Sequence, residues 1–228
     1  MKSHELIANI RKDLNLAEKV ELDDEVLAES YVVLPKTYNL ATEFLSKKAK
    51  ASHAELYAHY AERLTRVSSE LDAVNRDDVH RFNMLKSEEI YNMNAVYLHE
   101  LYFANISDLQ SEIKMDTLPY MRLNRDFGTF DEWQYDFVSC SQGDGNGWAV
   151  CAFSTFLQKY INFFVSSHDC SIPVGCYPVI VLDVWEHAYT RDYGTDRKTY
   201  TYAMMKEFNW RIIEERFKRA EKIAEALR

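Results

Sequence analysis

Two stretches in the first half of the chain repeat apolar and aromatic residues at helical spacing. The first begins near Ser46 and places these residues on one face: His53, Leu56, Tyr57, Tyr60, Leu64, Val67 and Leu71. The second follows Asp77 and Asp78 and has the same kind of stripe: Asn92, Ala95, Val96, His99, Tyr102, Phe103 and Ile106. This spacing predicts two long helices, each with one buried face. Because only a short polar stretch separates them, we expect an antiparallel helical hairpin.

After Ile106 the pattern changes to short apolar runs separated by turn residues. Breaks are marked by Pro119, a turn at 126–128 and a glycine-rich stretch at 143–147. Three β-rich runs at 148–153, 160–166 and 179–184 predict a small antiparallel sheet. The tail at 200–228 is expected to be helical and to pack through these residues: Met204, Met205, Phe208, Trp210, Ile213 and Phe217.

The order of these elements predicts an α+β protein. We expect a long α-helical hairpin at 31–112 and a mixed C-terminal domain at 113–228, with a three-stranded antiparallel sheet flanked by helices. Residues 1–30 are expected to form a polar, acidic extension with a short helix at 6–14. This extension is either a surface helix or an arm that docks on a further protein. The charged N-terminus lacks the core of a signal peptide, and polar residues interrupt the apolar region 148–165. We therefore expect a soluble, cytoplasmic protein without a membrane span.

Charge and composition indicate which binding partners and which kind of core to expect. The 27 basic and 36 acidic residues give a formal net charge of −9, which argues against binding nucleic acid or an anionic membrane. The 15 Tyr, 12 Phe and 4 Trp predict a core of large rings that can enclose a buried site. Cys140, Cys151, Cys170 and Cys176 contain no C-x-x-C pair, so we expect reduced, mostly buried thiols and no zinc ribbon.

Candidate chemistry gathers around Asp183 and His187, which directly follow an apolar run. A carboxylate oxygen and a neutral imidazole nitrogen together suit iron or manganese, although this spacing alone is weak. His53 and His99 each lie on the apolar face of a predicted helix, where a lone histidine is more often a core residue. Three buried imidazoles and a carboxylate need partners for their polar atoms, so the combined set favours a metal site. His168, after the second β-rich run, is a candidate to bond a metal-bound water.

Several segments resemble one known family, the iron/manganese superoxide dismutases. DVWEHAY at 183–189 is similar to the hallmark of that family, and RDYGTDRKTY and FNWRIIEERF resemble its continuation. Upstream segments are also similar to the family: LPKTYNLATEFLSKKAKASH at 34–53, YLHELYFANI at 97–106, DFGTF at 126–130 and GNGWAV at 145–150. The resemblance covers about residues 32–220.

This resemblance implies one iron or manganese ion per chain, held between the two domains, and superoxide as the substrate. The implied ligands are the residues named above: His53, His99, Asp183 and His187. His168 falls where many members have a glutamine that bonds the metal-bound solvent, and Ala95 marks the alternative position for that glutamine. Trp148 and Trp185 match rings that line the metal cavity. Glu186 resembles the residue that reaches the second subunit's equivalent of His187, which implies a homodimer.

The chain also departs from the family where substrate and protons enter. The gateway tyrosine of the family falls at Ala61, its histidine partner at Tyr57, and the tyrosine that crosses the dimer at Thr190. Tyr57, at the gateway position, and Tyr60 are the candidates to fill this space. We therefore expect slower proton supply. An alternative is a structural or assembly protein, for example of a virus particle, with this fold and reduced or no activity. The sequence does not decide between iron and manganese.

Overall fold

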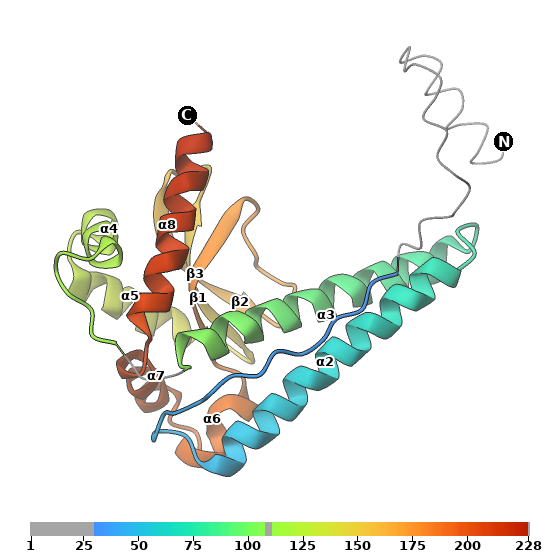
Figure 1. Cartoon of the computed structure of the whole chain (residues 1–228), viewed down its shortest axis with the longest axis horizontal. Coiled ribbons are helices and arrows are strands. Elements are labelled where there is room, and N and C mark those ends of the chain that lie inside the picture. Colours follow the sequence, from blue (N-terminus) through green and yellow to red (C-terminus); the bar gives the residue numbers. More distant parts are fainter. Residues whose placement is uncertain (1–29, 108–110, 228) are drawn as a thin grey trace.

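A long helical hairpin projects from a compact α/β body (Figure 1). The computed structural model describes residues 30–107 and 111–227. Helices α2 (Lys47–Ala73) and α3 (Val79–Asn105) form the hairpin, which confirms the prediction from their apolar stripes. The side chain of Ser46 caps the start of α2, and that of Asp78 caps the start of α3. The expected N-terminal extension, with its helix or docking arm, lies outside the described residues apart from Ser30.

A three-stranded antiparallel sheet forms the centre of the body. Strand β1 (Gly147–Ser154) lies between β2 (Lys159–Ser166) and β3 (Cys176–Asp183), in the order β2-β1-β3. Every residue of β1 is buried, because this central strand is paired on both edges and covered on both faces. Its register places Trp148 opposite both Val165 and Asp183. The predicted α+β class with a small antiparallel sheet is confirmed.

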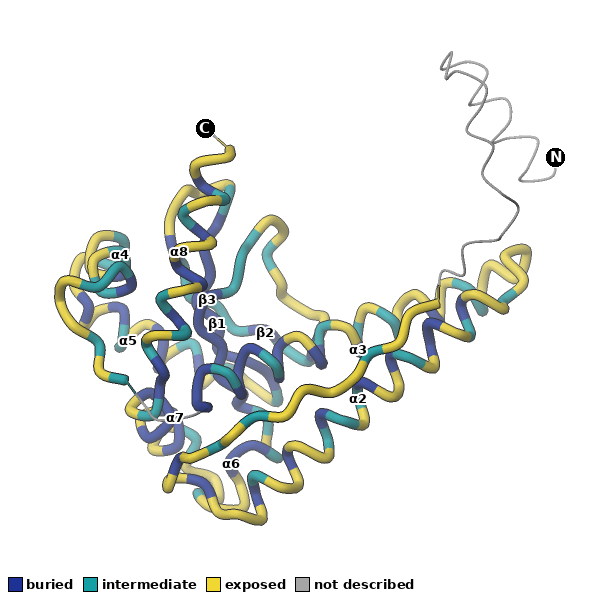
Figure 2. The backbone as a smooth tube through the Cα atoms, viewed as in Figure 1, coloured by how far each residue is buried: buried dark blue, intermediate teal, exposed yellow. Residues whose placement is uncertain are grey.

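Helices flank this sheet and complete the core. They are α4 (Leu118–Phe127), α5 (Phe130–Ser141), α6 (Glu186–Tyr193), α7 (Arg197–Lys206) and α8 (Trp210–Ala226). One large hydrophobic cluster joins the sheet, these helices and the near ends of α2 and α3. Exposure rises toward the far end of the hairpin (Figure 2). None of the helices in the described part of the chain is long and apolar enough to cross a membrane.

The expectation of a helical tail holds for α7 and α8 but is wrong at residues 207–209, where the chain breaks between these helices. The backbone N–H of Asn209 donates to the carbonyl of Asn105 at 2.6 Å, which draws the chain back to the end of α3. The side chain of Asn209 then accepts from the backbone N–H of Ile212 at 3.3 Å and caps α8. The break therefore comes from a contact between segments that lie far apart in the sequence.

The cysteine expectation is also wrong in part. All four thiols are free, but Cys151 alone among them is fully buried. Cys170 is exposed on the loop after β2, and Cys140 and Cys176 are half-buried. The reason is their position, since Cys151 lies on the central strand, Cys170 lies on a loop, and Cys140 and Cys176 lie at the ends of α5 and β3.

Candidate metal centre

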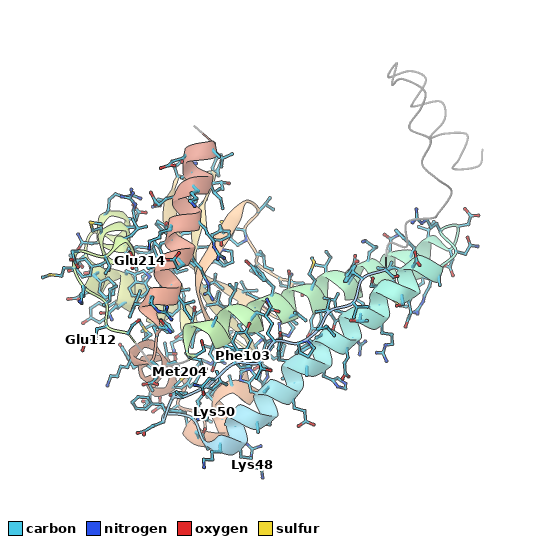
Figure 3. The ribbon with its side chains drawn as sticks, viewed as in Figure 1. Lys48, Lys50, Phe103, Glu112, Met204 and Glu214 are labelled. Carbon is cyan, nitrogen blue, oxygen red and sulfur yellow. The ribbon has the colours of Figure 1, made fainter. Side chains whose placement is uncertain are left out.

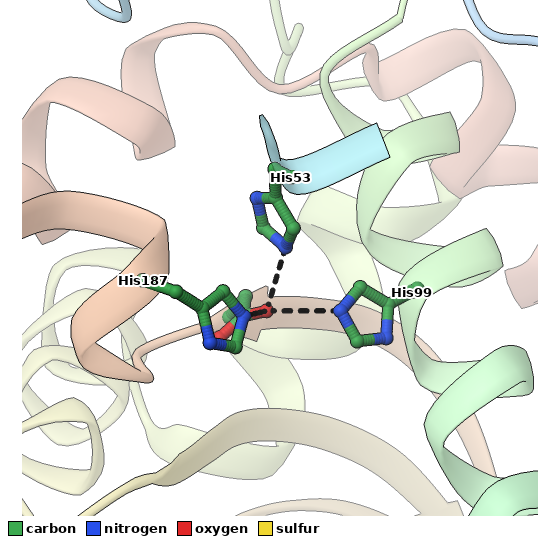
Figure 4. Close-up of side chains that lie close together, drawn as sticks. His53, His99 and His187 are labelled. Carbon is green, nitrogen blue, oxygen red and sulfur yellow. Dashed lines mark hydrogen bonds and ion pairs between the residues drawn. The ribbon is translucent and has the colours of Figure 1, made fainter. Parts of the chain in front are cut away.

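Four side chains from four separate elements meet at the junction of the hairpin and the body (Figure 4). His53 comes from α2, His99 from α3, Asp183 from the end of β3 and His187 from α6. One potential ligand atom from each lies within 4.8 Å of all the others. The Nε2 atoms of His53, His187 and His99 lie 3.0, 3.2 and 3.6 Å from Oδ2 of Asp183. The structure thus brings together all four residues that the sequence predicts as ligands.

The strand end orients Asp183 and His187 toward each other. Oδ1 of Asp183 accepts from the backbone N–H of Trp185 at 2.9 Å, which turns the chain into α6. His187 lies in the first turn of α6, four residues after Asp183, and its Nε2 lies 3.2 Å from Oδ2 of the same carboxylate. Behind the strand, the hydroxyl of Tyr200 donates to the carbonyl of Asp183 at 2.8 Å and also contacts the hydroxyl of Tyr102 at 3.1 Å. This pair fixes the backbone of Asp183.

The ring of His99 shows that a cation fits this group. Its Nδ1–H donates to the carbonyl of Ala95 at 2.6 Å, so the lone pair of the neutral ring lies on Nε2. That Nε2 atom is fully buried and has no hydrogen-bond partner among the described residues. It points instead toward the carboxylate of Asp183. Metal-binding histidines commonly have this arrangement, with one nitrogen fixed by a carbonyl and the other free for the ion.

Burial and charge set the protonation of the group. Burial lowers the pKa of His99 to about 3, and burial also lowers the pKa of His53. Burial acts to raise the pKa of Asp183, but the charges and hydrogen bonds of His187 and His53 outweigh it and lower that pKa. An ionised carboxylate and neutral imidazoles are the protonation states that bind a cation.

Aromatic rings wall the group on several sides. Trp148 is fully buried, and its ring meets that of His99 edge-on at a centroid distance of 4.9 Å. Trp185 stacks on His187 at 5.7 Å and on His168 at 4.7 Å. Both tryptophans therefore lie at the rings of the candidate ligands, where the sequence comparison places cavity-lining residues.

His168 lies next to the group and is held by two hydrogen bonds. The indole N–H of Trp148 donates to its Nδ1 at 3.1 Å, so the neutral ring carries its proton on Nε2. This Nε2 atom lies 3.2 Å from the hydroxyl oxygen of Tyr60. Burial lowers the pKa of His168 to about 4. The ring of Tyr91 packs edge-on against His168 at 4.8 Å and adjoins Tyr60 at 6.4 Å.

The hydroxyl of Tyr57, the residue at the gateway position, is held by two hydrogen bonds. Its hydroxyl accepts from the backbone N–H of Lys36 at 3.0 Å and donates to Glu100 at 3.1 Å. Neither partner is His168, and Tyr60 supplies the hydroxyl that reaches that imidazole. Of the two candidates for the gateway, Tyr60, one helical turn further along α2, is therefore the one that is hydrogen-bonded to His168.

The other departures from the family, Ala61, Thr190 and Phe103, which stands where the resemblance implies a tryptophan, have plain structural consequences. Ala61 is completely buried, so the missing ring is filled by protein. Thr190 is exposed, and its hydroxyl donates to the carbonyl of Glu186 at 2.7 Å within α6. Phe103 packs edge-on against His53 at 4.9 Å and fills the inner end of the hairpin (Figure 3).

A cavity of about 380 Å³ opens to solvent beside His187. It is lined by Ser52, His53, His187, Thr190 and Arg191. Glu186 is exposed next to it, and its carboxylate makes no ion pair with any residue that the structure describes. Small anions therefore have access to the candidate ligands from this side, past the positive charge of Arg191.

Comparisons with known proteins agree with this geometry. Residues 119–216 match the family model for iron/manganese superoxide dismutases, C-terminal domain. The superoxide dismutase [Fe] of Cupriavidus metallidurans is 33% identical over 179 residues, which cover 76% of this chain and 88% of that protein. The chain belongs to the iron/manganese superoxide dismutase family.

Relatives named for either metal are found. The superoxide dismutase [Fe] of Aquifex pyrophilus is 29% identical over 194 residues, covering 82% of this chain and 90% of that protein. The superoxide dismutase [Mn] of Nocardia asteroides is 25% identical over 170 residues, covering 74% and 82%. Relatives named for iron and for manganese are both consistent with three imidazole nitrogens and one carboxylate oxygen, because these donors suit both ions.

Sequence reasoning missed three supports of the site. Tyr200 and Tyr102 hold the backbone of Asp183, and the carbonyl of Ala95 orients His99. The spacing of Ala95 and His99, four residues apart on one helix, is a signal for the last of these. No comparable signal marks Tyr200, because its contact depends on how α7 packs beneath β3.

Proposed function

We propose that this protein is an active superoxide dismutase, in which His53, His99, Asp183 and His187 hold one iron or manganese ion. The observation that carries the proposal is the buried, unpartnered Nε2 of His99, directed at a carboxylate that two other imidazoles share. Family membership supports the same assignment. Neutral nitrogen and carboxylate oxygen donors match the preferences of these ions.

The overall reaction converts two superoxide anions and two protons into dioxygen and hydrogen peroxide. When bound, the ion supplies the one-electron redox change that this reaction needs. Asp183 offsets part of its positive charge, and burial, which lowers the pKa of His53 and of His99, favours the neutral form of these two donors. Trp148 and Trp185 exclude bulk water from the rings, which strengthens the electrostatic interactions inside the site.

Proton supply is the task we assign to His168 and Tyr60. The tautomer fixed by Trp148 leaves a proton on Nε2 of His168, within hydrogen-bond distance of the Tyr60 hydroxyl. Tyr60 also lines a cavity of about 510 Å³ that opens to solvent between α2 and α3. Water in this cavity can therefore resupply the Tyr60 hydroxyl with protons, and the Nε2–H of His168 can donate to that oxygen and stabilise it when it gives its proton up, in place of the relay that Ala61 and Thr190 have lost.

We also propose that the protein acts as a homodimer through the face that carries Glu186. This carboxylate is exposed beside His187 and lacks an ion-pair partner among the described residues, so an imidazole of a second subunit is a suitable partner. No observation on the described residues favours the structural alternative, such as a virion component, over the enzyme.

The test is elemental analysis together with a superoxide-consumption assay on the purified protein. We expect about one iron or manganese per chain and turnover that disappears in Asp183→Ala together with the metal. Full metal content without turnover would refute the enzymatic proposal and favour a structural role. Absence of both metals from protein produced in metal-replete cells would refute the ligand assignment.

A further inference from the structure

A third pocket, rich in hydrogen-bond donors, is lined by residues of α3, α8, the start of β3 and the extended segment before α2. Its volume is about 380 Å³. The donors that line it come from six side chains: Lys36, Tyr38, Tyr97, Tyr177, Arg216 and Arg219. None of its lining residues belongs to the candidate metal centre, so this pocket is a separate feature of the fold.

Arg216 carries a buried positive charge at the base of this pocket. Its side chain lies on α8, and the residue is 6% exposed. The guanidinium donates to the side-chain carbonyl of Asn105 and to the backbone carbonyls of Val179 at 3.3 Å and Leu101 at 3.1 Å. These partners are neutral, and no described carboxylate lies within 4.0 Å. Burial lowers the pKa of Arg216 to about 10, as expected for a cation without a counter-charge.

Arg216 also has N–H groups that are free to bind a ligand in the pocket. A guanidinium has five N–H donors, and the three bonds above leave two without a described partner. Arg219, about one helical turn after Arg216 on α8, is exposed and makes no ion pair or hydrogen bond with a described residue. Two cations with free N–H groups therefore line one cavity.

Three tyrosines add hydroxyl donors to these cations. The hydroxyls of Tyr38, Tyr97 and Tyr177 make no hydrogen bond with a described residue. Their rings do not stack under the guanidiniums, because the cation–π contact found within the described chain joins Arg197 to Tyr189. Burial and Tyr177 raise the pKa of Tyr97, while Arg216 and Arg219 act to lower it, which indicates that its hydroxyl lies near both cations.

The two acidic residues that line the pocket already have ion-pair partners. Glu100 pairs with Lys36 and accepts from Tyr57, and Glu215 pairs with Lys218 at the rim at 2.8 Å. Three cationic and two acidic lining residues give a net charge of +1, within a chain whose net charge is −9. The pocket therefore has more free hydrogen-bond donors than free acceptors. An anion with several acceptor oxygens would satisfy these donors.

We propose that this pocket binds a small oxyanion, such as inorganic phosphate or the phosphate group of a small metabolite. Several oxygens on one centre can accept from the two guanidiniums and the tyrosine hydroxyls at once. The bound charge also compensates Arg216, whose burial is otherwise unfavourable. This site does not depend on the dismutase activity, and its ligand contacts neither His53 nor His187.

The proposal is tested by titrating inorganic phosphate into the metal-loaded, ¹⁵N-labelled full-length protein at constant ionic strength. The arginine Nε–H signals report binding, and acetate and chloride replace phosphate in parallel titrations. We expect saturable shifts with one site per chain. Arg219→Gln and Tyr177→Phe should each weaken phosphate binding, the former by about tenfold or more. Arg216 itself is left unchanged because it ties α8 to α3 and β3.

The matched control is Arg211→Gln, which removes the same charge from an exposed position on the same helix. It should leave the phosphate affinity unchanged. Saturable binding of acetate in addition to phosphate, with the same loss in Arg219→Gln, would identify carboxylates as a second source of the oxyanion. The proposal is overturned if no shift saturates, if chloride competes equally well, or if Arg211→Gln weakens binding as much as Arg219→Gln.

Discussion

Replacing Tyr60 by phenylalanine isolates the hydroxyl that we assign to proton supply. The ring stays in place against His168 and Tyr91, and only the oxygen 3.2 Å from Nε2 of His168 is removed. Tyr60 contributes no candidate ligand atom, so the metal content should not change. The variant therefore separates delivery of protons from binding of the ion.

The expected magnitudes follow from burial. His168 is fully buried, and loss of its partner leaves a polar nitrogen unsatisfied, which should lower the free energy of unfolding by about 1–3 kcal/mol. Positioned proton transfer typically contributes about 10²–10⁴-fold to a rate. Because Tyr60 is half-buried beside an open cavity, water can replace part of its function. We therefore expect turnover to fall by about 10²-fold, the lower end of that range.

Stopped-flow decay of superoxide at equal metal content measures this change. The matched control is Tyr57→Phe, since that hydroxyl binds Lys36 and Glu100 and not His168. We expect it to cost stability while leaving turnover per metal unchanged. A large loss of turnover in Tyr57→Phe with little change in Tyr60→Phe would refute the assignment and restore the gateway role to Tyr57.

Other consequences of the structure are open to test. His99→Ala should remove most of the iron or manganese found by elemental analysis, because its Nε2 has no other described partner; normal metal content would contradict the ligand set. Metal-free protein should lose stability as the pH falls from about 6.5 to 4, because His168 is buried. Its contribution to the free energy of unfolding should fall by up to about 1.4 kcal/mol per pH unit. The reason is that burial holds the pKa of His168 near 4, so the unfolded chain binds more protons in this range; urea midpoints that do not fall would contradict this. Glu186→Ala should shift the protein toward monomer in analytical ultracentrifugation, and an unchanged dimer would exclude this carboxylate from the interface. Ala61→Tyr should lower the urea midpoint, since added volume at a completely buried position costs about 1–3 kcal/mol; an unchanged midpoint would mean that the site has free space.

The hairpin and the four candidate ligands could be predicted because their signals are local. Helical spacing places His53 and His99 on the buried faces of α2 and α3. Asp183 and His187 follow an apolar strand, and the turn between them spans a few residues. Each of these features depends on neighbours in the sequence and not on distant packing.

The gateway could not be predicted because it depends on distant contacts. Tyr57 and Tyr60 share the same helical stripe with His53, and nothing local distinguishes their hydroxyls. The choice is made by His168, which lies 108 residues from Tyr60 in the sequence, on the loop after β2. The break before α8 has the same origin, since Asn209 binds the backbone of Asn105.

The start of α5, in contrast, has a local sequence signal, a capping box at Thr129 and Glu132. It directly follows the segment 126–128, which the sequence pattern predicts to be a turn. Thr129 accepts from the backbone N–H of Glu132 at 3.0 Å, which is the spacing of a capping box. Gly128 ends α4 at a φ of 92°, a backbone conformation that favours glycine. The turn predicted at 126–128 is therefore wrong for Asp126 and Phe127, which end α4, and the link between the two helices is Gly128 and Thr129.

The central claim is that four residues from α2, α3, β3 and α6 hold one redox-active ion. Its most direct test is a crystal structure of the purified protein with anomalous diffraction measured at the iron and manganese absorption edges. We predict one anomalous peak per chain, about 2.0–2.3 Å from Nε2 of His53, His99 and His187 and from a carboxylate oxygen of Asp183. A fully loaded crystal without a peak at this position, or with the ion bound by other side chains, would contradict the account.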